Sequence, residues 1–159
     1  MSKHRWKRYL VLPVSLLAAG VLFWLLVALP TAAADTTATV RYVAPGGNCG
    51  GASPCYASIQ AAVDAAQDGD EIRIAQGTYT GVSTENGVTA LVHLYQQDMY
   101  LTLRGGYTTS DWEQADPTAH PAVLDAQGQG VGVYVKCIGC GADVPLDGLH
   151  ITGGYASES

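Results

Sequence analysis

The chain has 159 residues, of which 14 are acidic and eight are basic, giving a net charge of −6. This length suits one domain of ordinary size. Four of the basic residues lie at positions 3–8 and every acidic residue lies at position 35 or later, so the chain from residue 35 onward carries a net charge of −10. Such an acidic domain is not expected to bind nucleic acid or an anionic surface through bulk electrostatics, and the charge also favours solubility.

Residues 1–34 have the pattern of a secretory signal peptide. A basic segment at positions 3–8 is followed by an apolar run at 10–29 and by three alanines at 32–34. Small residues at this place predict cleavage before Asp35. The apolar run is also long enough to span a bilayer, so an uncleaved signal anchor is the alternative, which would tether the protein to the membrane. Both interpretations predict export, to the medium or the cell surface.

The exported part opens with a short β pattern at 40–43 and a turn-rich segment, and a helix is expected next. Ser58 is a suitable N-cap, and apolar residues recur at helical spacing on one face. These residues are Ile59, Ala62, Val63 and Ala66. The segment Asp68-Gly69-Asp70 is expected to end the helix, because glycine suits the left-handed position that follows many helices.

From Glu71 onward the hydrophobic period changes from that of a helix to that of a strand. Short strands separated by turn residues are predicted at 71–74, 91–95, 99–104, 123–125, 132–135 and 149–152. No second helix is long enough for a βαβ crossover, and no Asn-Gly or Asp-Gly dipeptide falls regularly between strands. The pattern therefore indicates an all-β sandwich, barrel or solenoid.

One family resemblance selects among these architectures. The resembling segments are 42–45, 58–66 with the sequence SIQAAVDAA, 69–79 with GD-x-I-x-I-x-x-G-x-Y, 103–107, 122–125 and 148–154. Together they resemble the start of pectin-lyase-like proteins, over about residues 41–155. The resemblance implies a right-handed parallel β-helix with an N-terminal capping α-helix. Residues 35–159 would then form the N-terminal part of such a domain, truncated after two to three coils, with no second cap following 149–152.

Four cysteines lie in the exported part: Cys49, Cys55, Cys137 and Cys140. An oxidising compartment and the local spacing favour Cys49–Cys55 and Cys137–Cys140 disulfides. A redox-active C-x-x-C pair would need a helix starting at the motif, which glycine and proline nearby disfavour. A zinc site is the remaining alternative, with a spacing unlike the usual zinc ribbons.

Enzymes of the resembling group carry their catalytic aspartates, and lyases a basic arginine, on the middle coils. The exported part contains no Asn-Thr-Asp, Asp-Asp, Gly-His-Gly or Arg-x-Lys motif. No catalytic residue, metal ligand or cofactor is therefore carried over from the resemblance. Calcium is compatible with the acidic composition, but no specific motif supports it.

Aromatic and charged side chains provide the weak binding candidates. Tyr107 and Trp112 could stack on sugar rings, since a flat aromatic face matches the C–H face of a pyranose. The alternative is that Trp112 folds back and anchors its loop. Arg104, expected to point outward, could grip a sugar carboxylate together with Asp125, or form an ordinary surface pair with it.

The remaining polar candidates have ordinary structural explanations. The histidines of the exported part are too scattered for a metal cluster, and a lone strand histidine on an outward face is expected to be solvated. They are His93, His120 and His150. The carboxylates of Asp68, Asp70 and Glu71 could ligate calcium, but the segment 68–70 also serves to stop the helix.

Two functions follow as hypotheses. The first is an exported, non-catalytic β-helix module with a binding or structural role toward an extracellular polysaccharide or a cell-surface component. The second is the N-terminal part of a polysaccharide lyase or glycoside hydrolase whose catalytic coils lie beyond residue 159; this one rests on fold analogy alone. In either case the uncapped C-terminal end is expected to favour self-association.

Overall fold

A computed structural model describes residues 37–96, 100–137 and 144–155 of the chain. These residues are mostly β, with parallel sheets, and include one short α-helix, α2 (Ile59–Asp64), and one 3-10 turn, η1 (Pro45–Gly47). The strands are β1 (Val40–Val43), β2 (Cys55–Tyr56), β3 (Glu71–Ala75), β4 (Gly77–Tyr79), β5 (Ser83–Glu85), β6 (Val88–Gln96), β7 (Thr102–Tyr107), β8 (Ala122–Asp125), β9 (Val131–Cys137), β10 (Leu146–Asp147) and β11 (Leu149–Thr152). The predicted leader, residues 1–34, lies outside the described residues.

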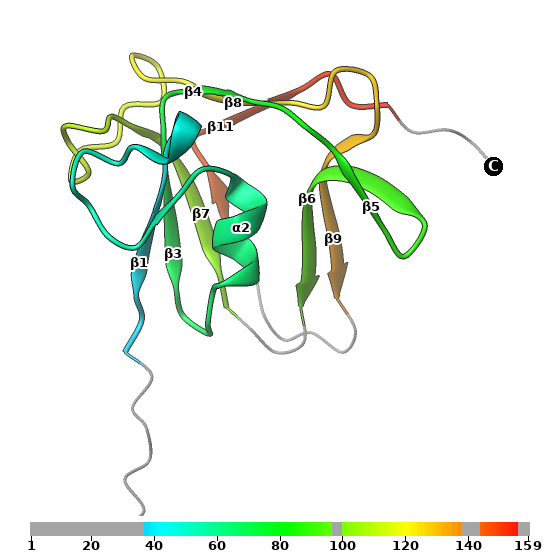
Figure 1. Ribbon diagram of the computed structural model, residues 1–159, viewed down its shortest axis with the longest axis horizontal. Helices are drawn as coiled ribbons and strands as arrows, with labels where there is room; N and C mark the ends of the chain where they lie inside the picture. The colour runs from blue at the N-terminus through cyan, green and yellow to red at the C-terminus, as the bar shows by residue number, and fades with distance from the viewer. Residues whose placement is uncertain (1–36, 97–99, 138–143, 156–159) are drawn as a thin grey trace, which may run out of the picture. The chain divides into compact units, whose positions relative to one another are not determined.

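The strands form three sheets, which successive strands enter in a repeating order. Sheet A has the order β10-β7-β3-β1-β2, sheet B the order β11-β8-β4 and sheet C the order β5-β6-β9. From β3 onward the chain passes from sheet A to B to C, returns to A at β7, and repeats the sequence to β11 (Figure 1). Among the strands that the structure describes, every pairing is parallel except that of β5 with β6.

The core lies between the sheets and is built by the period-2 alternation of the strands. Ile72 on β3 pairs in register with Leu103 on β7, and both side chains are fully buried. Leu124 on β8 and Leu94 on β6 join the same apolar cluster from the other two sheets. The predicted strands therefore bury the faces that their alternation indicates.

The helix begins where the sequence predicts and ends earlier. Ser58 is the N-cap, and its Oγ accepts a hydrogen bond from the backbone N–H of Ala61 at 3.2 Å. The expected helical stripe to Ala66 is wrong in its last turn, because the helix ends at Asp64. Gly69 is left-handed, with φ of 84°, but it lies in a separate turn that Asp70 closes onto the carbonyl of Gln67.

The α2 helix packs on the first strands of the sheets. Its contacts are with β6, β1, β2 and β3 (Figure 1). The side-chain amide of Gln60 accepts a hydrogen bond from His93 N at 2.7 Å and donates one to His93 O at 3.2 Å. The strand β5 pairs with β6 only as far as Ala90, and at His93 the Gln60 amide forms the hydrogen bonds that a neighbouring strand would otherwise form. The strands β1 and β2 lie beside β3, and η1 contacts β4. Together with α2, these elements are called the closed end.

Several strand boundaries differ from the sequence prediction. The strand expected at 99–104 begins at Thr102, and the one expected at 91–95 extends over 88–96. Its first residues form a hairpin with β5 that the sequence analysis missed. Asn86 and Gly87 are its two turn residues, both with positive φ, and Glu85 pairs with Val88 across them. An Asn-Gly turn of this kind is a recognised hairpin signal.

Candidate functional site

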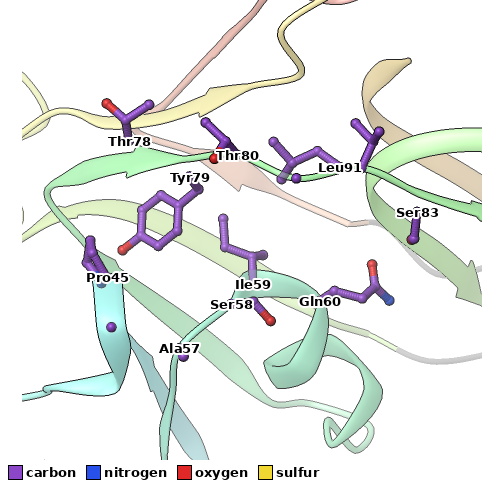
Figure 2. A pocket seen from close by; sticks show the side chains of 13 residues that line it. Pro45, Ala57, Ser58, Ile59, Gln60, Thr78, Tyr79, Thr80, Ser83 and Leu91 are labelled. Carbon is purple, nitrogen blue, oxygen red and sulfur yellow. The ribbon is translucent and has the colours of Figure 1, made fainter. Parts of the chain in front are cut away.

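A half-open pocket of about 380 Å³ lies beside the closed end, where β4 and the segment after it pass over the start of α2. Figure 2 shows Tyr79 and Thr80 on one side of it, with Ile59 and Ser58 below them, while the side chain of Thr78 points away from Tyr79 on the other side of β4. The full lining is Pro45, Gly46, Ala57, Ser58, Ile59, Gln60, Thr78, Tyr79, Thr80, Gly81, Val82, Ser83 and Leu91.

The local sequence explains how these elements come together. Gly77 opens β4 with φ of 143°, and a Cβ there would come within 2.7 Å of Cγ of Pro45. Only glycine therefore lets η1 approach β4 at this point. The N-cap Ser58 sets the start of α2 below them. The β5–β6 hairpin then brings Ser83 and Leu91 to the far side of the pocket, as Figure 2 shows.

Tyr79 forms a rigid part of the wall. Its hydroxyl lies 2.9 Å from the carbonyl oxygen of Ala75 and 3.3 Å from that of Val43, and its side chain is buried. Burial raises the pKa of Tyr79 far above its ordinary value, so the phenol stays neutral in water at any physiological pH. The ring is held in place by two backbone carbonyls and presents carbon to the pocket.

The other lining side chains are also uncharged. Thr78, Thr80 and Ser83 carry hydroxyls and are exposed to solvent, while Ile59 and Leu91 are buried aliphatic residues. No Asp, Glu, Lys, Arg or His side chain belongs to the lining. The pocket therefore offers hydroxyl donors and acceptors above an apolar floor, and the chemistry it provides is hydrogen bonding to a neutral molecule.

The sequence candidates for sugar stacking, Tyr107 and Trp112, lie elsewhere and are buried, with 2% and 9% of their surfaces exposed. The indole Nε1 of Trp112 donates to Cys49 O at 3.1 Å, and its ring meets that of Tyr42 edge to face at 5.0 Å. The backbone carbonyl of Trp112 accepts a hydrogen bond from Arg73. Trp112 thus anchors its loop to the first strands of sheet A, as the alternative interpretation expected.

Arg104 points outward, as expected, but its acidic partner is not Asp125. The residues Tyr42, Arg73, Arg104 and Asp147 lie in one register row across sheet A. Arg104 Nε lies 3.0 Å from Asp147 Oδ2, and its Nη1 lies 3.7 Å from Glu71 Oε1. Asp125 instead accepts the backbone N–H of Gln127. Arg104 meets Asp147 and Glu71 because β7 lies between β10 and β3 in sheet A, an arrangement that the spacing of these residues in the sequence does not show.

The three histidines occupy three different environments. The expectation that His93 is solvated is wrong, because it is 1% exposed beneath the β4–β5 segment and its Nε2 lies 3.0 Å from Ser83 O. His120 Nδ1 lies 2.9 Å from Gln76 Oε1, and His150 is exposed on β11.

The acidic residues considered for calcium are engaged by protein donors. Asp70 accepts hydrogen bonds from the backbone N–H groups of Thr39 and Gln67, and from Arg41 Nε at 2.7 Å. Asp68 accepts the backbone N–H of Tyr100. Glu71 forms ion pairs with Arg73 and Arg104. Within residues 37–96, 100–137 and 144–155, no group of three or more His, Cys, Asp or Glu side chains is placed to hold a metal ion.

The predicted Cys49–Cys55 disulfide is confirmed, with Cα atoms 5.9 Å apart. It closes the loop that places Cys49 O beneath Trp112. The Cys137–Cys140 pair lies outside the described residues, since Cys140 and the side chain of Cys137 are not among them.

The pocket itself was missed from the sequence. Its available signal is the run Thr78-Tyr79-Thr80, in which a large aromatic residue stands between two threonines on a short strand and points to the face opposite Thr78. That signal is weak, because short Thr-rich strands are common.

In the part of the chain that the structure covers, no helix is long and apolar enough to cross a membrane. Comparison with known proteins gives no further guide: no protein-family model, no curated protein and no solved structure matches the chain significantly.

Proposed function

We propose that this chain is an exported, non-catalytic module built on a right-handed parallel β-helix, and that it binds an uncharged saccharide unit of an extracellular polysaccharide or cell-surface component. The observation that carries the proposal is the lining of the pocket beside the closed end, which combines exposed hydroxyls with an aromatic and aliphatic floor.

The β-helix part of the proposal is supported by the repeating A, B, C order of parallel strands in three sheets. Each return to a sheet adds one strand beside the previous one, in register, as in a solenoid of stacked coils. The handedness comes from the resemblance of the segment 58–79 to pectin-lyase-like proteins. Export is supported by the leader pattern of residues 1–34.

The ligand class follows from complementarity of chemical groups. A sugar ring offers hydroxyls at its rim and C–H groups on its faces. Thr80 and Ser83 supply hydroxyl partners, and Ile59 and the Tyr79 ring supply carbon surface. An acidic sugar has no cation to pair with in this lining. The excess of acidic residues over the whole chain also disfavours a polyanionic ligand.

The proposal is tested by titrating the protein with neutral and acidic oligosaccharides and following backbone amide signals by NMR. Neutral sugars are expected to shift the amides of residues 78–83 and 57–60, while oligogalacturonate does not. Thr80→Val keeps the side-chain volume, removes one hydroxyl and should weaken binding about three- to tenfold. Thr118→Val, in a loop that does not line the pocket, is the matched control and should bind as the unmutated chain does.

Three results contradict the proposal. Binding of oligogalacturonate as tight as that of neutral sugars would refute the neutral ligand class. Equal affinities of the Thr80→Val and Thr118→Val variants would place any binding elsewhere. New reducing-end signals appearing during the titration would show cleavage, and so refute the non-catalytic role in favour of a lyase or hydrolase.

A further inference from the structure

The β5–β6 hairpin folds back over one face of its own second strand. In the register of the hairpin, Ser83 lies opposite Ala90 and Glu85 lies opposite Val88. The hydroxyl of Tyr95 nevertheless donates a hydrogen bond to Glu85 O at 3.1 Å. In a flat hairpin Tyr95 would lie on the order of 20 Å beyond Val88 along β6. The strand β6 must therefore bend, so that β5 lies over the face that carries Tyr95.

His93 holds the other end of β5. Its Nε2 lies 3.0 Å from Ser83 O, and the ring proton belongs on Nε2 because a carbonyl oxygen only accepts hydrogen bonds. The ring is 1% exposed, and its Nδ1 has no hydrogen-bond partner among the described residues. Most buried polar atoms are hydrogen-bonded, so an imidazole with one unpaired nitrogen requires an explanation. Within the described part of the chain, the bond to Ser83 O is the one hydrogen bond that this ring makes.

Neighbouring side chains fix the imidazole of His93. The Tyr95 ring stacks on it, with the two planes 7° apart and the centroids at 5.9 Å. The Tyr134 ring on β9 meets it edge to face at 6.2 Å. Gln60 holds the backbone of His93 through both atoms of its side-chain amide. His93 Nε2 is therefore a donor whose position is set from α2, β6 and β9.

The residue that His93 holds is part of the pocket beside the closed end. Val82 and Ser83 line the pocket from the hairpin side. The segment 80–82 belongs to no strand, so its position depends on the residues that anchor its two ends. At one end the hydroxyl of Tyr79 bonds to two backbone carbonyls, and at the other end Ser83 is held by His93.

We infer that His93 is a positioning residue of the pocket, an inference that rests on the saccharide binding proposed above. The bond from Nε2 to Ser83 O holds the wall formed by residues 80–83, and with it the hydroxyls of Thr80 and Ser83. His93 is not itself a lining residue, so it acts on the ligand through this wall. A wall that is already ordered loses less conformational entropy when a sugar binds, which favours affinity.

Substitutions at His93 test the inference by hydrogen exchange and by titration with cellotetraose, xylotetraose and mannotetraose. His93→Phe keeps a ring beside the two tyrosines and removes the donor. It should speed exchange of the amides of residues 83–85 about tenfold and weaken sugar binding about threefold or more. His93→Gln offers an amide N–H in place of Nε2–H and should restore both properties toward those of the unmutated chain.

Two tyrosine variants complete the set. Tyr95→Phe removes the second bond to β5 and should act in the same direction as His93→Phe. Tyr134→Phe is the matched control, because it keeps the ring against His93 and removes a hydroxyl that does not bond to β5. It should change neither exchange nor affinity. The amides of β3 and β7 serve as the internal reference for global stability and should exchange at one rate in all variants.

Several results overturn the inference. Equal behaviour of His93→Phe and His93→Gln would mean that ring packing matters and donation does not. A change in exchange without a change in affinity, or the reverse, would separate His93 from the pocket wall. Faster exchange of β3 and β7 in His93→Phe would assign the residue to the core. An unmutated chain that binds none of the three sugars refutes the proposed function instead, and the exchange rates then decide alone whether His93 holds the wall.

Discussion

Leu124 on β8 and Ile151 on β11 are register partners on neighbouring parallel strands, yet Leu124 is fully buried and Ile151 is 43% exposed. The side-chain type and the orientation toward the core are alike. The difference is that β8 lies between β4 and β11, whereas β11 has a partner strand on one side alone among the described residues. Burial in this fold is therefore set by position along the stack of strands.

This relationship predicts unequal costs for the same truncation. Leu124→Ala removes a fully packed side chain and should lower the free energy of unfolding by about 2–5 kcal/mol. Ile151→Ala removes a half-exposed one and should cost about 1 kcal/mol, since much of its surface already faces water. Urea unfolding of both variants at dilute concentration measures the difference. Equal costs would show that Ile151 is packed as fully as Leu124.

The Trp112 anchor predicts a graded loss of stability. Trp112→Phe keeps an aromatic ring against Tyr42 but removes the hydrogen bond to Cys49 O, at a cost of about 1 kcal/mol. Trp112→Ala also removes the ring and should cost about 3–5 kcal/mol. Thermal melting followed by circular dichroism checks the order. A Trp112→Ala variant as stable as the unmutated chain would mean that the loop does not depend on the indole.

Removal of the Cys49–Cys55 disulfide should destabilise the closed end. Cys49→Ser combined with Cys55→Ser frees a loop with a sequence separation of 6 residues. The loss of the cross-link should cost about 2 kcal/mol through the entropy of the unfolded chain. Comparing urea midpoints of the double variant and of the unmutated oxidised chain measures it. Identical midpoints would contradict the expectation.

Asp70 predicts a loss of stability in acid. Burial opposes its ionisation, but hydrogen bonds from the N–H groups of Gln67 and Thr39 and from Arg41 outweigh burial, so the pKa of Asp70 lies below its ordinary value of 3.8. The unfolded chain therefore takes up the proton first as pH falls. The stability that Asp70 contributes is complete above pH 3.8 and is lost as pH falls through the folded pKa.

The test of this pH effect compares two carboxylates. Asp70→Asn should be less stable than the unmutated chain at neutral pH and should lose less stability between neutral pH and pH 3. Glu113→Gln, whose side chain is 82% exposed, is the control and should keep the unmutated pH profile. An unchanged profile for Asp70→Asn would show that Asp70 does not stabilise the fold by its charge.

Much of the fold follows from local sequence signals. The alternation of Glu71 to Ile74 and the N-cap Ser58 predict a strand and a helix start where they occur. The Cys49–Cys55 bond follows from the short spacing of the two cysteines. These features depend on neighbours in sequence, which the chain itself displays.

The features that were missed depend on which strands become neighbours in space. The pairing of Arg104 with Asp147 across sheet A needs the register of β7 and β10, which spans 43 residues of sequence. The burial of His93 needs the β4–β5 segment to cross over it. The helix ends at Asp64 with Ala65 as its C-cap, although the helical spacing of apolar residues continues to Ala66.

Residue-resolved hydrogen exchange tests most directly whether the strands stack in the order β10-β7-β3-β1-β2 in sheet A, with β11 and β9 at the margins of sheets B and C. At a concentration where the chain is monomeric, the amides of β3 and β7, which lie between paired strands in sheet A, should be the most protected. Amides on the outer edge of β9 and β11 should exchange much faster, because no strand among residues 37–96, 100–137 and 144–155 accepts their hydrogen bonds. Protection of β9 and β11 equal to that of β3 and β7 would contradict the account.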